Sequence, residues 1–449
     1  MSTWGSYDLI KVLGTGVSST VYLSKHQETA VLWALKVMNS ELDESSLEYM
    51  VNNELSVLAK CSHSNMVNLV DYKSGATLTH KDGRKDSVFY IALELANGGE
   101  LFDYLAQTGA FTEDIARYYF LQMIDTLAYL QSKGYSHRDM KTENIMLDSE
   151  FNLKIADFGF SSSESKNETQ VGTKAYMAPE ILLNTEYNGA GVDLFAAGIV
   201  LFIFVACHQP FMIANPNKKP YHYIVKWNSD KFWDFHSKNK PNGSDYFSDE
   251  FKDLVTLMLQ YDKFHRPSVA EIKEHPWWKG PVPTAEEIKQ EFANRKAELE
   301  AQNNEEFAVD QTGVIDSEMF NSWENVSRGD GDNENLDFVD REWEVYVSEL
   351  KRCTQFFSTS NLNDLFNTLG KFATDYAASF KIGEKYNAIL DVIEEETKLQ
   401  MEVDILKVPD QEKYCIEVSR KSGDIFLFNK IYKQLKQFYG GHVNATETS

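Results

Sequence analysis

The chain has 449 residues and a formal net charge of −24 at pH 7, and 43% of its residues are hydrophobic. This length exceeds that of one ordinary domain, so we expect two or three domains with packed cores. The acidic balance argues against a nucleic-acid-binding protein, because clustered lysines and arginines hold phosphate backbones. We therefore expect no nucleic acid among its partners.

The cysteines lie far apart, at Cys61, Cys207, Cys353 and Cys415, and lack the spacing of a metal site. They indicate reduced, mostly buried thiols. The first residues are polar and show no secretory signal. The longest apolar run, residues 194–207, is too short to span a bilayer and predicts a buried helix. We expect a soluble protein of the cytoplasm, with the nucleus as the alternative compartment.

Residues 7–12 have the pattern of a strand, which leads into a glycine-rich turn. In this turn Gly14, Gly16 and Ser19 form a G-x-G-x-x-S pattern, and glycines let the backbone approach a phosphate closely. Alone, the pattern fits any hairpin tip. A second strand, predicted over residues 31–38, follows at the spacing expected of a nucleotide site.

Lys36 lies between apolar neighbours in this second strand. A half-buried lysine needs a partner, because an unpaired buried charge is costly. The helical segment predicted over residues 45–60 offers Glu54. The alternative is a surface lysine whose stem lies along apolar neighbours.

Residues 137–180 contain the candidate catalytic side chains, which suit the transfer of a phosphoryl group. Such a transfer needs held metal ions, an aligned acceptor and neutralised charge more than covalent help. Asp139 can orient or deprotonate a hydroxyl, and Lys141 adds a positive charge beside the transferring group. Asn144 and Asp157 supply oxygen ligands suited to Mg²⁺. Each fragment alone could also be a polar loop between strands.

In order, His-Arg-Asp at 137–139, Asn144, Asp-Phe-Gly at 157–159 and Ala-Pro-Glu at 178–180 resemble the motifs of eukaryotic protein kinases. Lys141 marks the serine/threonine-specific branch. The resemblance is greatest to the calmodulin-dependent and AMP-activated group, in which a serine at the third glycine position also occurs. It implies the transfer of the γ-phosphate of ATP, with Mg²⁺, to serine or threonine of protein substrates.

The implied fold is α+β, a two-lobed protein kinase fold over residues 1–280. The β-rich N-lobe extends to about residue 96, and the helical C-lobe covers about residues 97–280.

The resemblance also implies an ion pair between Lys36 and Glu54, with Lys36 holding the α- and β-phosphates. The strand over residues 88–93 leads into the hinge between lobes, where Leu93 guards the adenine pocket. The residues implied to bind ATP are Gly14, Gly16, Val21, Ala34, Lys36, Glu54, Leu93, Glu94, Ala96 and Asp157. The implied catalytic residues are Asp139, Lys141 and Asn144, and the implied metal ligands are Asn144 and Asp157.

A polar, serine-rich segment over residues 160–171 follows the Asp-Phe-Gly motif. Arg138, next to Asp139, would have no partner for its charge unless an anion arrives, and phosphorylation supplies one. We expect Thr169, three residues before Gly172, to be the phosphosite, as in AMP-activated-type kinases, and an upstream kinase to be a partner. The alternative is a merely solvated loop.

Other residues are implied to be structural. Thr173 packs near Asp139, and Asp193 bonds the backbone at residues 137–138. Arg266 pairs with Glu180 in a buried ion pair. The family usually has tryptophan where this chain has Phe195, which removes an indole donor but keeps the packing.

Glu100 and Glu143 are implied to face the peptide groove, and opposed carboxylates favour a basic residue upstream of the acceptor. The alternative is that both are solvated surface acids.

After the catalytic domain, residues 281–342 are expected to form a helix and then an acidic linker. Thr284 and Glu287 have the spacing of a capping box, which would open a helix ending near residue 300. Residues 343–440 regain globular patterning, with a helix at 362–376 and strands between residues 379 and 420. A closing helix is predicted over residues 429–438, followed by a tail over 441–449.

Residues 415–436 resemble the end of a kinase-associated 1 domain. In that family the domain docks on its own kinase domain to inhibit it, or binds anionic lipid. A basic face could form from Arg420, Lys421, Lys430, Lys433 and Lys436. The alternative is scattered solvated lysines, and we favour intramolecular regulation.

Two other functions are weighed against this one. A pseudokinase or scaffold would need a broken metal or phosphate residue, and none of these residues is replaced. Alternatively, the C-terminal domain has the main role, as a lipid- or partner-binding anchor.

Overall fold

The structure is a computed structural model that describes residues 3–4, 6–15, 19–38, 53–79, 85–164, 166–303, 306–307, 354–383, 386–394, 397–409 and 411–440. The chain divides into two compact units, Met1–Asn294 and Arg295–Ser449. Gly16, most of the predicted acidic linker and the predicted tail lie outside the described residues.

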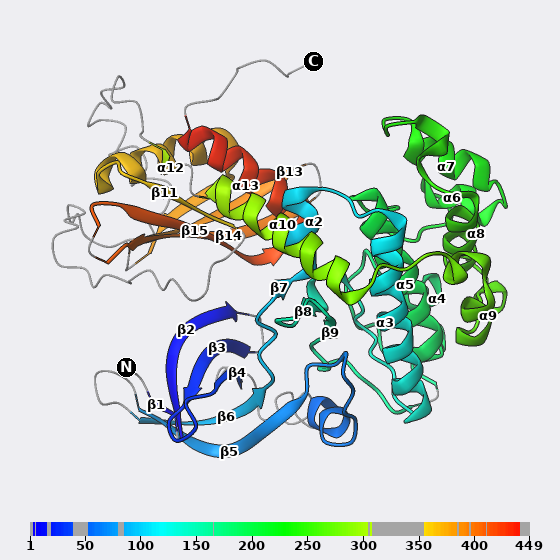
Figure 1. Ribbon diagram of the computed structural model, residues 1–449, viewed down its shortest axis with the longest axis horizontal. Coiled ribbons are helices and arrows are strands. Elements are labelled where there is room, and N and C mark those ends of the chain that lie inside the picture. The colour runs from blue at the N-terminus through cyan, green and yellow to red at the C-terminus, as the bar shows by residue number, and fades with distance from the viewer. Residues whose placement is uncertain are drawn as a thin grey trace. The chain divides into compact units, whose positions relative to one another are not determined.

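The first unit begins with an antiparallel sheet that closes into a barrel, in the order β1-β2-β3-β4-β6-β5 (Figure 1). Its strands are β1 (Thr3–Trp4), β2 (Tyr7–Thr15), β3 (Ser19–His26), β4 (Leu32–Met38), β5 (Leu69–Thr79) and β6 (Lys85–Leu93). Leu35 and Val37 of β4 belong to the apolar core of this sheet. Because side chains alternate along a strand, Lys36 points away from this core, toward the helical residues 53–58.

A helical lobe follows. Its helices are α2 (Leu101–Thr108), α3 (Glu113–Ser132), α4 (Pro179–Leu182), α5 (Gly189–Ala206), α6 (Tyr221–Val225), α7 (Ser229–Ser237), α8 (Asp249–Met258) and α9 (Val269–Glu274). The strands β7 (Gly99–Glu100), β8 (Ile145–Leu147) and β9 (Leu153–Ile155) form a small antiparallel sheet, and the 3-10 turn η1 (Thr142–Asn144) precedes β8. The β-rich and helical lobes confirm the predicted kinase fold.

Helix α5 is the core of the helical lobe. It is apolar around its whole circumference, as expected for a helix surrounded by protein. The Asn188 side chain accepts a hydrogen bond from the Gly191 N–H at the start, and Cys207 ends the helix with a left-handed φ of 56°. Its length and composition would suit a membrane span, but 89% of it is buried inside the protein. The prediction of a buried helix is therefore confirmed.

Helix α10 (Ala285–Asn303) packs against the helical lobe through its first half. Its first turn has the predicted capping box, in which Thr284 and Glu287 exchange hydrogen bonds. The Phe292 side chain is fully buried and lies among the rings of Tyr104 and Phe151, at centroid distances of 5.0 and 5.3 Å. The first half of α10 therefore belongs to the core of the first unit.

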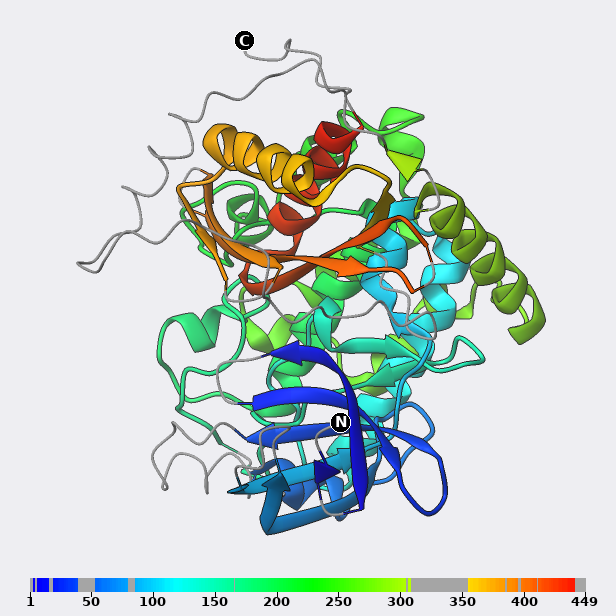
Figure 2. The same cartoon turned by 90° about the vertical axis from the view of Figure 1, so that its left-hand side faces the viewer.

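The second unit contains a six-stranded sheet in the order β10-β11-β15-β14-β13-β12. The strands are β10 (Glu306–Phe307), β11 (Gln355–Ser358), β12 (Ser379–Ile382), β13 (Asn387–Glu394), β14 (Thr397–Lys407) and β15 (Tyr414–Gly423). Helices α12 (Leu362–Tyr376) and α13 (Ile425–Tyr439) cover one face (Figure 2). Alternate residues of β14, including Met401 and Val403, belong to one apolar core with residues of both helices. The α+β prediction for this region is confirmed.

One boundary prediction was wrong. The closing helix begins at Ile425 instead of residue 429, because the Asp424 carboxylate accepts a hydrogen bond from the Leu427 N–H and caps the helix.

Candidate active site

Lys36 connects two carboxylates between the lobes. Its Nζ lies 2.9 and 2.8 Å from the two Glu54 oxygens and 3.1 Å from Oδ1 of Asp157. Burial opposes the charge of Lys36, but Glu54 and Asp157 outweigh burial and raise its pKa. The charge of Lys36 lowers the pKa of Asp157 well below its ordinary value, against the effect of burial. The predicted ion pair between Lys36 and Glu54 is confirmed, while burial raises the pKa of the Glu54 carboxyl against the effect of Lys36.

Asp157 combines this charge with access to solvent. Its side chain is 44% exposed, although Lys36 binds one of its oxygens. Its backbone has a positive φ of 61°, a conformation that is strained for a non-glycine residue and concentrates at functional sites. A partly exposed carboxylate whose pKa lies well below its ordinary value is a ligand of the kind that Mg²⁺ prefers.

Asp139 lies at the centre of a second cluster and is almost fully buried. Its Oδ1 accepts hydrogen bonds from the backbone N–H and the hydroxyl of Thr173, at 2.9 and 3.1 Å. Its Oδ2 accepts one from Lys141 Nζ at 2.6 Å. Lys141 also donates to the Thr173 hydroxyl at 3.2 Å. The prediction that Thr173 packs near Asp139 and Lys141 is confirmed.

Asn144 and Asp157 are brought together by the β8–β9 hairpin, in which Ile145 is opposite Ile155. Asn144 directly precedes the hairpin and Asp157 follows it by two residues, so both lie at its open end. The Asn144 Nδ2 donates to the Asp139 carbonyl at 2.8 Å. This bond directs the amide oxygen of Asn144 away from Asp139 and makes it the atom that could bind a metal ion.

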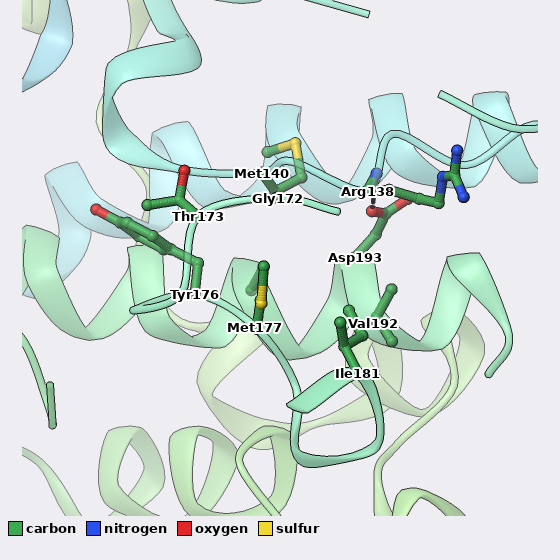
Figure 3. Close-up of a pocket in the computed structure, with 10 residues that line it drawn as sticks. Arg138, Met140, Gly172, Thr173, Tyr176, Met177, Ile181, Val192 and Asp193 are labelled. Carbon is green, nitrogen blue, oxygen red and sulfur yellow. Dashed lines mark hydrogen bonds between the residues drawn. The ribbon is translucent and has the colours of Figure 1, made fainter. Parts of the chain in front are cut away.

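Helix α5 supports the loop that carries Asp139. The Asp193 carboxylate accepts hydrogen bonds from the backbone N–H groups of His137 and Arg138, both at 2.7 Å, as predicted. Figure 3 shows the contact between Arg138 and Asp193. Gly172 crosses this loop with a φ of 103°, and a Cβ there would lie 2.7 Å from the Arg138 carbonyl. Glycine is therefore required at the point where the segment after Thr169 approaches the Asp139 loop.

A pocket lies beneath this crossing, between the Asp139 loop, residues 172–181 and α5 (Figure 3). The residues that line it are Arg138, Met140, Gly172, Thr173, Tyr176, Met177, Ile181, Val192, Asp193 and Ala196. Its lining is largely apolar apart from the groups that already bond the Asp139 loop.

Five of the residues implied to bind ATP lie side by side across the barrel sheet. Gly14 is opposite Val21, and Val21 is opposite Lys36. Ala34 is opposite Leu93, which ends β6. The register therefore gathers these five residues at one place, whereas Gly16 lies outside the described residues.

The hinge groups follow at Glu94 and Ala96. The Glu94 N–H donates to the Asn68 carbonyl at 2.9 Å, and the Gly99 N–H donates to the Ala96 carbonyl at 3.3 Å. The Glu94 N–H and the Ala96 carbonyl are therefore already bonded, so the prediction that these two residues bond a base rests on the Glu94 carbonyl and the Ala96 N–H. The Glu94 carboxylate is held by Lys154 Nζ at 2.5 Å, which fixes the start of the hinge.

The protein kinase domain family matches residues 7–278 of this chain. The chain belongs to the protein kinase family. It is 29% identical to CBL-interacting protein kinase 11 of Oryza sativa subsp. japonica, over 96% of this chain and 82% of that protein. It is 27% identical to CBL-interacting serine/threonine-protein kinase 9 of Arabidopsis thaliana, over 96% of this chain and 92% of that protein. The family and these relatives make it a serine/threonine protein kinase.

In this kinase the Arg138 guanidinium has hydrogen-bond partners, whereas the prediction that its charge lacks a partner until an anion arrives stays a prediction. It donates to the Phe160 carbonyl at 2.6 Å, to Asn167 Oδ1 at 2.9 Å and to the Tyr187 hydroxyl at 3.5 Å. Among the described residues, the acceptors that contact this guanidinium are all neutral. Sequence reasoning missed Asn167, because the polar segment carries several side chains that could accept and nothing in the sequence singles this one out.

Thr169 lies two residues further along the kinase's polar segment and is exposed. Its carbonyl accepts a hydrogen bond from the Tyr187 hydroxyl at 2.8 Å. The backbone at Thr169 is thus held while the side chain faces solvent.

The predicted ion pair between Arg266 and Glu180 is confirmed. Two parallel hydrogen bonds of 2.7 Å join the side chains, and both side chains are buried. The Arg266 guanidinium lies 4.7 Å from the ring centroid of Phe195. Phe195 therefore provides an aromatic face to this pair where the family usually has tryptophan.

Proposed function

We propose that the kinase binds Mg²⁺-ATP between the barrel sheet and the β8–β9 hairpin and uses Asp139 to position the acceptor hydroxyl. The observation that carries this proposal is the assembled set of Lys36, Glu54 and Asp157, which protein kinases require in place for phosphoryl transfer. The donor chemistry fits the cofactor. A charged lysine suits phosphate oxygens, and the oxygens of Asn144 and Asp157 suit Mg²⁺.

Each residue then has a defined task. Lys36 holds the α- and β-phosphates, and Asn144 and Asp157 would hold Mg²⁺, which neutralises charge on the phosphate oxygens when bound. Asp139 accepts the hydrogen bond of the incoming hydroxyl and takes its proton. Lys141, 2.6 Å from Asp139, balances negative charge at the transferring group.

Asp139→Asn tests this mechanism in the full chain, because it removes the proton acceptor and keeps the size of the side chain. We expect kcat for peptide phosphorylation to fall by roughly 10²–10⁴-fold, the usual contribution of a general base. Binding of Mg²⁺-ATP, followed by thermal shift, should persist. Asp249→Asn, at a side chain that is 96% exposed on α8, is the matched control and should retain activity. Full activity of Asp139→Asn would rule out the role given to Asp139.

The peptide series also tests substrate preference. We propose that Glu100 and Glu143 favour a basic residue upstream of the acceptor, because both are partly exposed beside the β7–β8 pair. A peptide with upstream arginines should have a lower KM than its alanine counterpart, and equal KM values would remove this preference.

We propose that phosphorylation of Thr169 by an upstream kinase raises activity. Its exposed side chain supports this, because a modifying enzyme can reach it. A phosphate there would add charge close to the buried Arg138, with which it can pair. The expected result is that activity rises with phosphate incorporation in the wild-type chain and stays constant in Thr169→Ala. An equal rise in both chains would place the activating site elsewhere.

We further propose that the second unit resembles a kinase-associated 1 domain and regulates the kinase. Two lysines of the candidate basic face already have carboxylate partners, since Lys421 pairs with Glu402 and Lys430 with Glu394. These pairs favour docking on protein over binding to anionic lipid. The names of the relatives describe them as CBL-interacting, so a CBL protein is a candidate partner.

A further inference from the structure

We propose that Asn167 is a positioning residue, whose amide takes the place of an activating phosphate on Arg138 and keeps the Asp139 loop assembled before any phosphorylation. This inference rests on the proposed role of Asp139. It concerns the described residues between Phe160 and Thr169, which lead to the proposed phosphosite.

The first observation is a buried guanidinium whose hydrogen bonds go to neutral acceptors, with the Asp193 carboxylate as a further electrostatic neighbour. Arg138 is only 7% exposed, and Asn167 is only 1% exposed. A buried guanidinium must be satisfied by hydrogen bonds, because desolvation of an unpaired charge is costly. The Asn167 amide oxygen, at 2.9 Å from Nη1, is the side-chain acceptor nearest to the guanidinium among the described residues.

The second observation is that three further hydrogen bonds, to Tyr187 and Glu164, hold Asn167 in place. Its N–H donates to the Tyr187 carbonyl at 2.9 Å, and its carbonyl accepts from the Tyr187 N–H at 3.0 Å. Its Nδ2 donates to the Glu164 carbonyl at 3.1 Å. The amide oxygen is therefore aimed at Arg138 by the backbone of both neighbouring segments, without dependence on the Thr169 side chain.

The third observation connects this contact to the reacting group. Arg138 precedes Asp139, and the Asp193 carboxylate fixes the backbone N–H of Arg138. Ser136 and Ser162 form a second bridge between the loop and the segment, with N–H to carbonyl distances of 2.9 and 3.0 Å. The segment is thus attached to the loop at Ser136 through the backbone and at Arg138 through the contacts of its guanidinium with Phe160 and Asn167.

A functional consequence follows. The kinase should have basal activity without phosphate on Thr169, because Arg138 is already satisfied. When Asn167 loses its oxygen, Arg138 is left with the Phe160 carbonyl and a longer contact to Tyr187. Activity should then depend strongly on the phosphate, which can replace the missing acceptor.

The experiment uses the full chain in the Thr169→Ala background, so that the site stays unmodified. Asn167→Ala should lower kcat for peptide phosphorylation by roughly tenfold, the effect of one lost charge-assisted hydrogen bond. The KM for ATP should change little, because Lys36 and the hinge are untouched. Asn167→Asp should restore kcat, since a carboxylate oxygen also accepts from Arg138. Gln260→Ala is the matched control, because it removes another buried amide, which donates to the Thr256 carbonyl at 3.0 Å.

Two results would overturn the proposal. One is an unchanged kcat in Asn167→Ala. The other is an equal loss in Asn167→Ala, Asn167→Asp and Gln260→Ala, which would reflect general destabilisation. In chains that retain Thr169, phosphorylation should raise the activity of Asn167→Ala by a larger factor than that of the wild type, and equal factors would also contradict the proposal. Failure of phosphate to activate the wild type would instead refute the role of Thr169 and leave the comparison in the Thr169→Ala background intact.

Discussion

At the scale of single residues, the pair of Arg266 and Glu180 shows how a buried charge is stabilised in this kinase. Both side chains are less than 10% exposed, two hydrogen bonds join them, and the Phe195 ring covers the guanidinium. Removing one member of such a pair leaves an uncompensated buried charge, which costs more than the pair itself contributes.

We therefore expect Arg266→Ala to lower the free energy of unfolding of residues 1–294 by about 3–5 kcal/mol, measured by urea denaturation. Lys166→Ala is the matched control, because it breaks an exposed pair with Glu186 and should change stability little. The double change Arg266→Met with Glu180→Gln should recover part of the loss, since no isolated charge remains. A loss no greater than that of the control would show that the pair is structurally dispensable.

The single-residue contacts divide into those that a motif predicts and those that only the fold creates. The contacts of Lys36, Thr173 and Asp193 were predicted, because the motif implies a definite partner for the side chain at each of these positions. The contact of Arg138 with Asn167 could not be, because it depends on how Tyr187 positions the backbone of the segment.

At the scale of elements, helix α10 shows that the packing of the helical lobe continues beyond residue 280, where its end was predicted. Phe292 joins the rings of Tyr104, Phe111, Tyr119 and Phe151 into one cluster, with centroid distances of 5.0 to 5.9 Å. The Tyr104 hydroxyl donates to the Gly98 carbonyl at 3.1 Å, so this cluster also supports the end of the hinge. The sequence predicted the capping box but not this packing, because a helix with mostly charged residues resembles a linker.

We expect Phe292→Ala to cost about 3–5 kcal/mol in the free energy of unfolding of residues 1–294, because it removes a fully buried ring. Phe264→Ala is the matched control at a side chain that is 85% exposed, and it should change stability by less than about 0.5 kcal/mol. Urea denaturation of the two variants measures the difference. Equal stabilities would show that α10 contributes no core packing.

At the scale of the whole molecule, the two units have separate cores. The first unit contains the groups proposed for catalysis, and the second forms a sheet covered by two helices. Each unit can therefore fold around its own core, and we propose the domain boundary within α10 rather than at its start.

Comparison of peptide phosphorylation by the full chain and by residues 1–294 tests regulation by the second unit. We expect kcat to rise several-fold in the shorter chain, because intramolecular docking contributes coupling free energies that correspond to about 5–150-fold. The shorter chain keeps Ile288 and Phe292, so a loss of activity would not follow from a damaged core. Equal kcat values would refute the inhibitory role, and association of the full chain with vesicles of anionic lipid would then favour targeting.

Helix α5 also has a consequence for the synthesis of the chain. Helix α5 leaves the ribosome before α8, one of the elements that pack against it. At a synthesis rate of about 5–20 residues per second, seconds pass before α8 follows. During that time the part of α5 that packs against α8 in the finished fold stays exposed to water, whereas the part that packs against the earlier helix α3 can already be covered. We therefore expect the nascent kinase to be a substrate for chaperones that recognise hydrophobic segments.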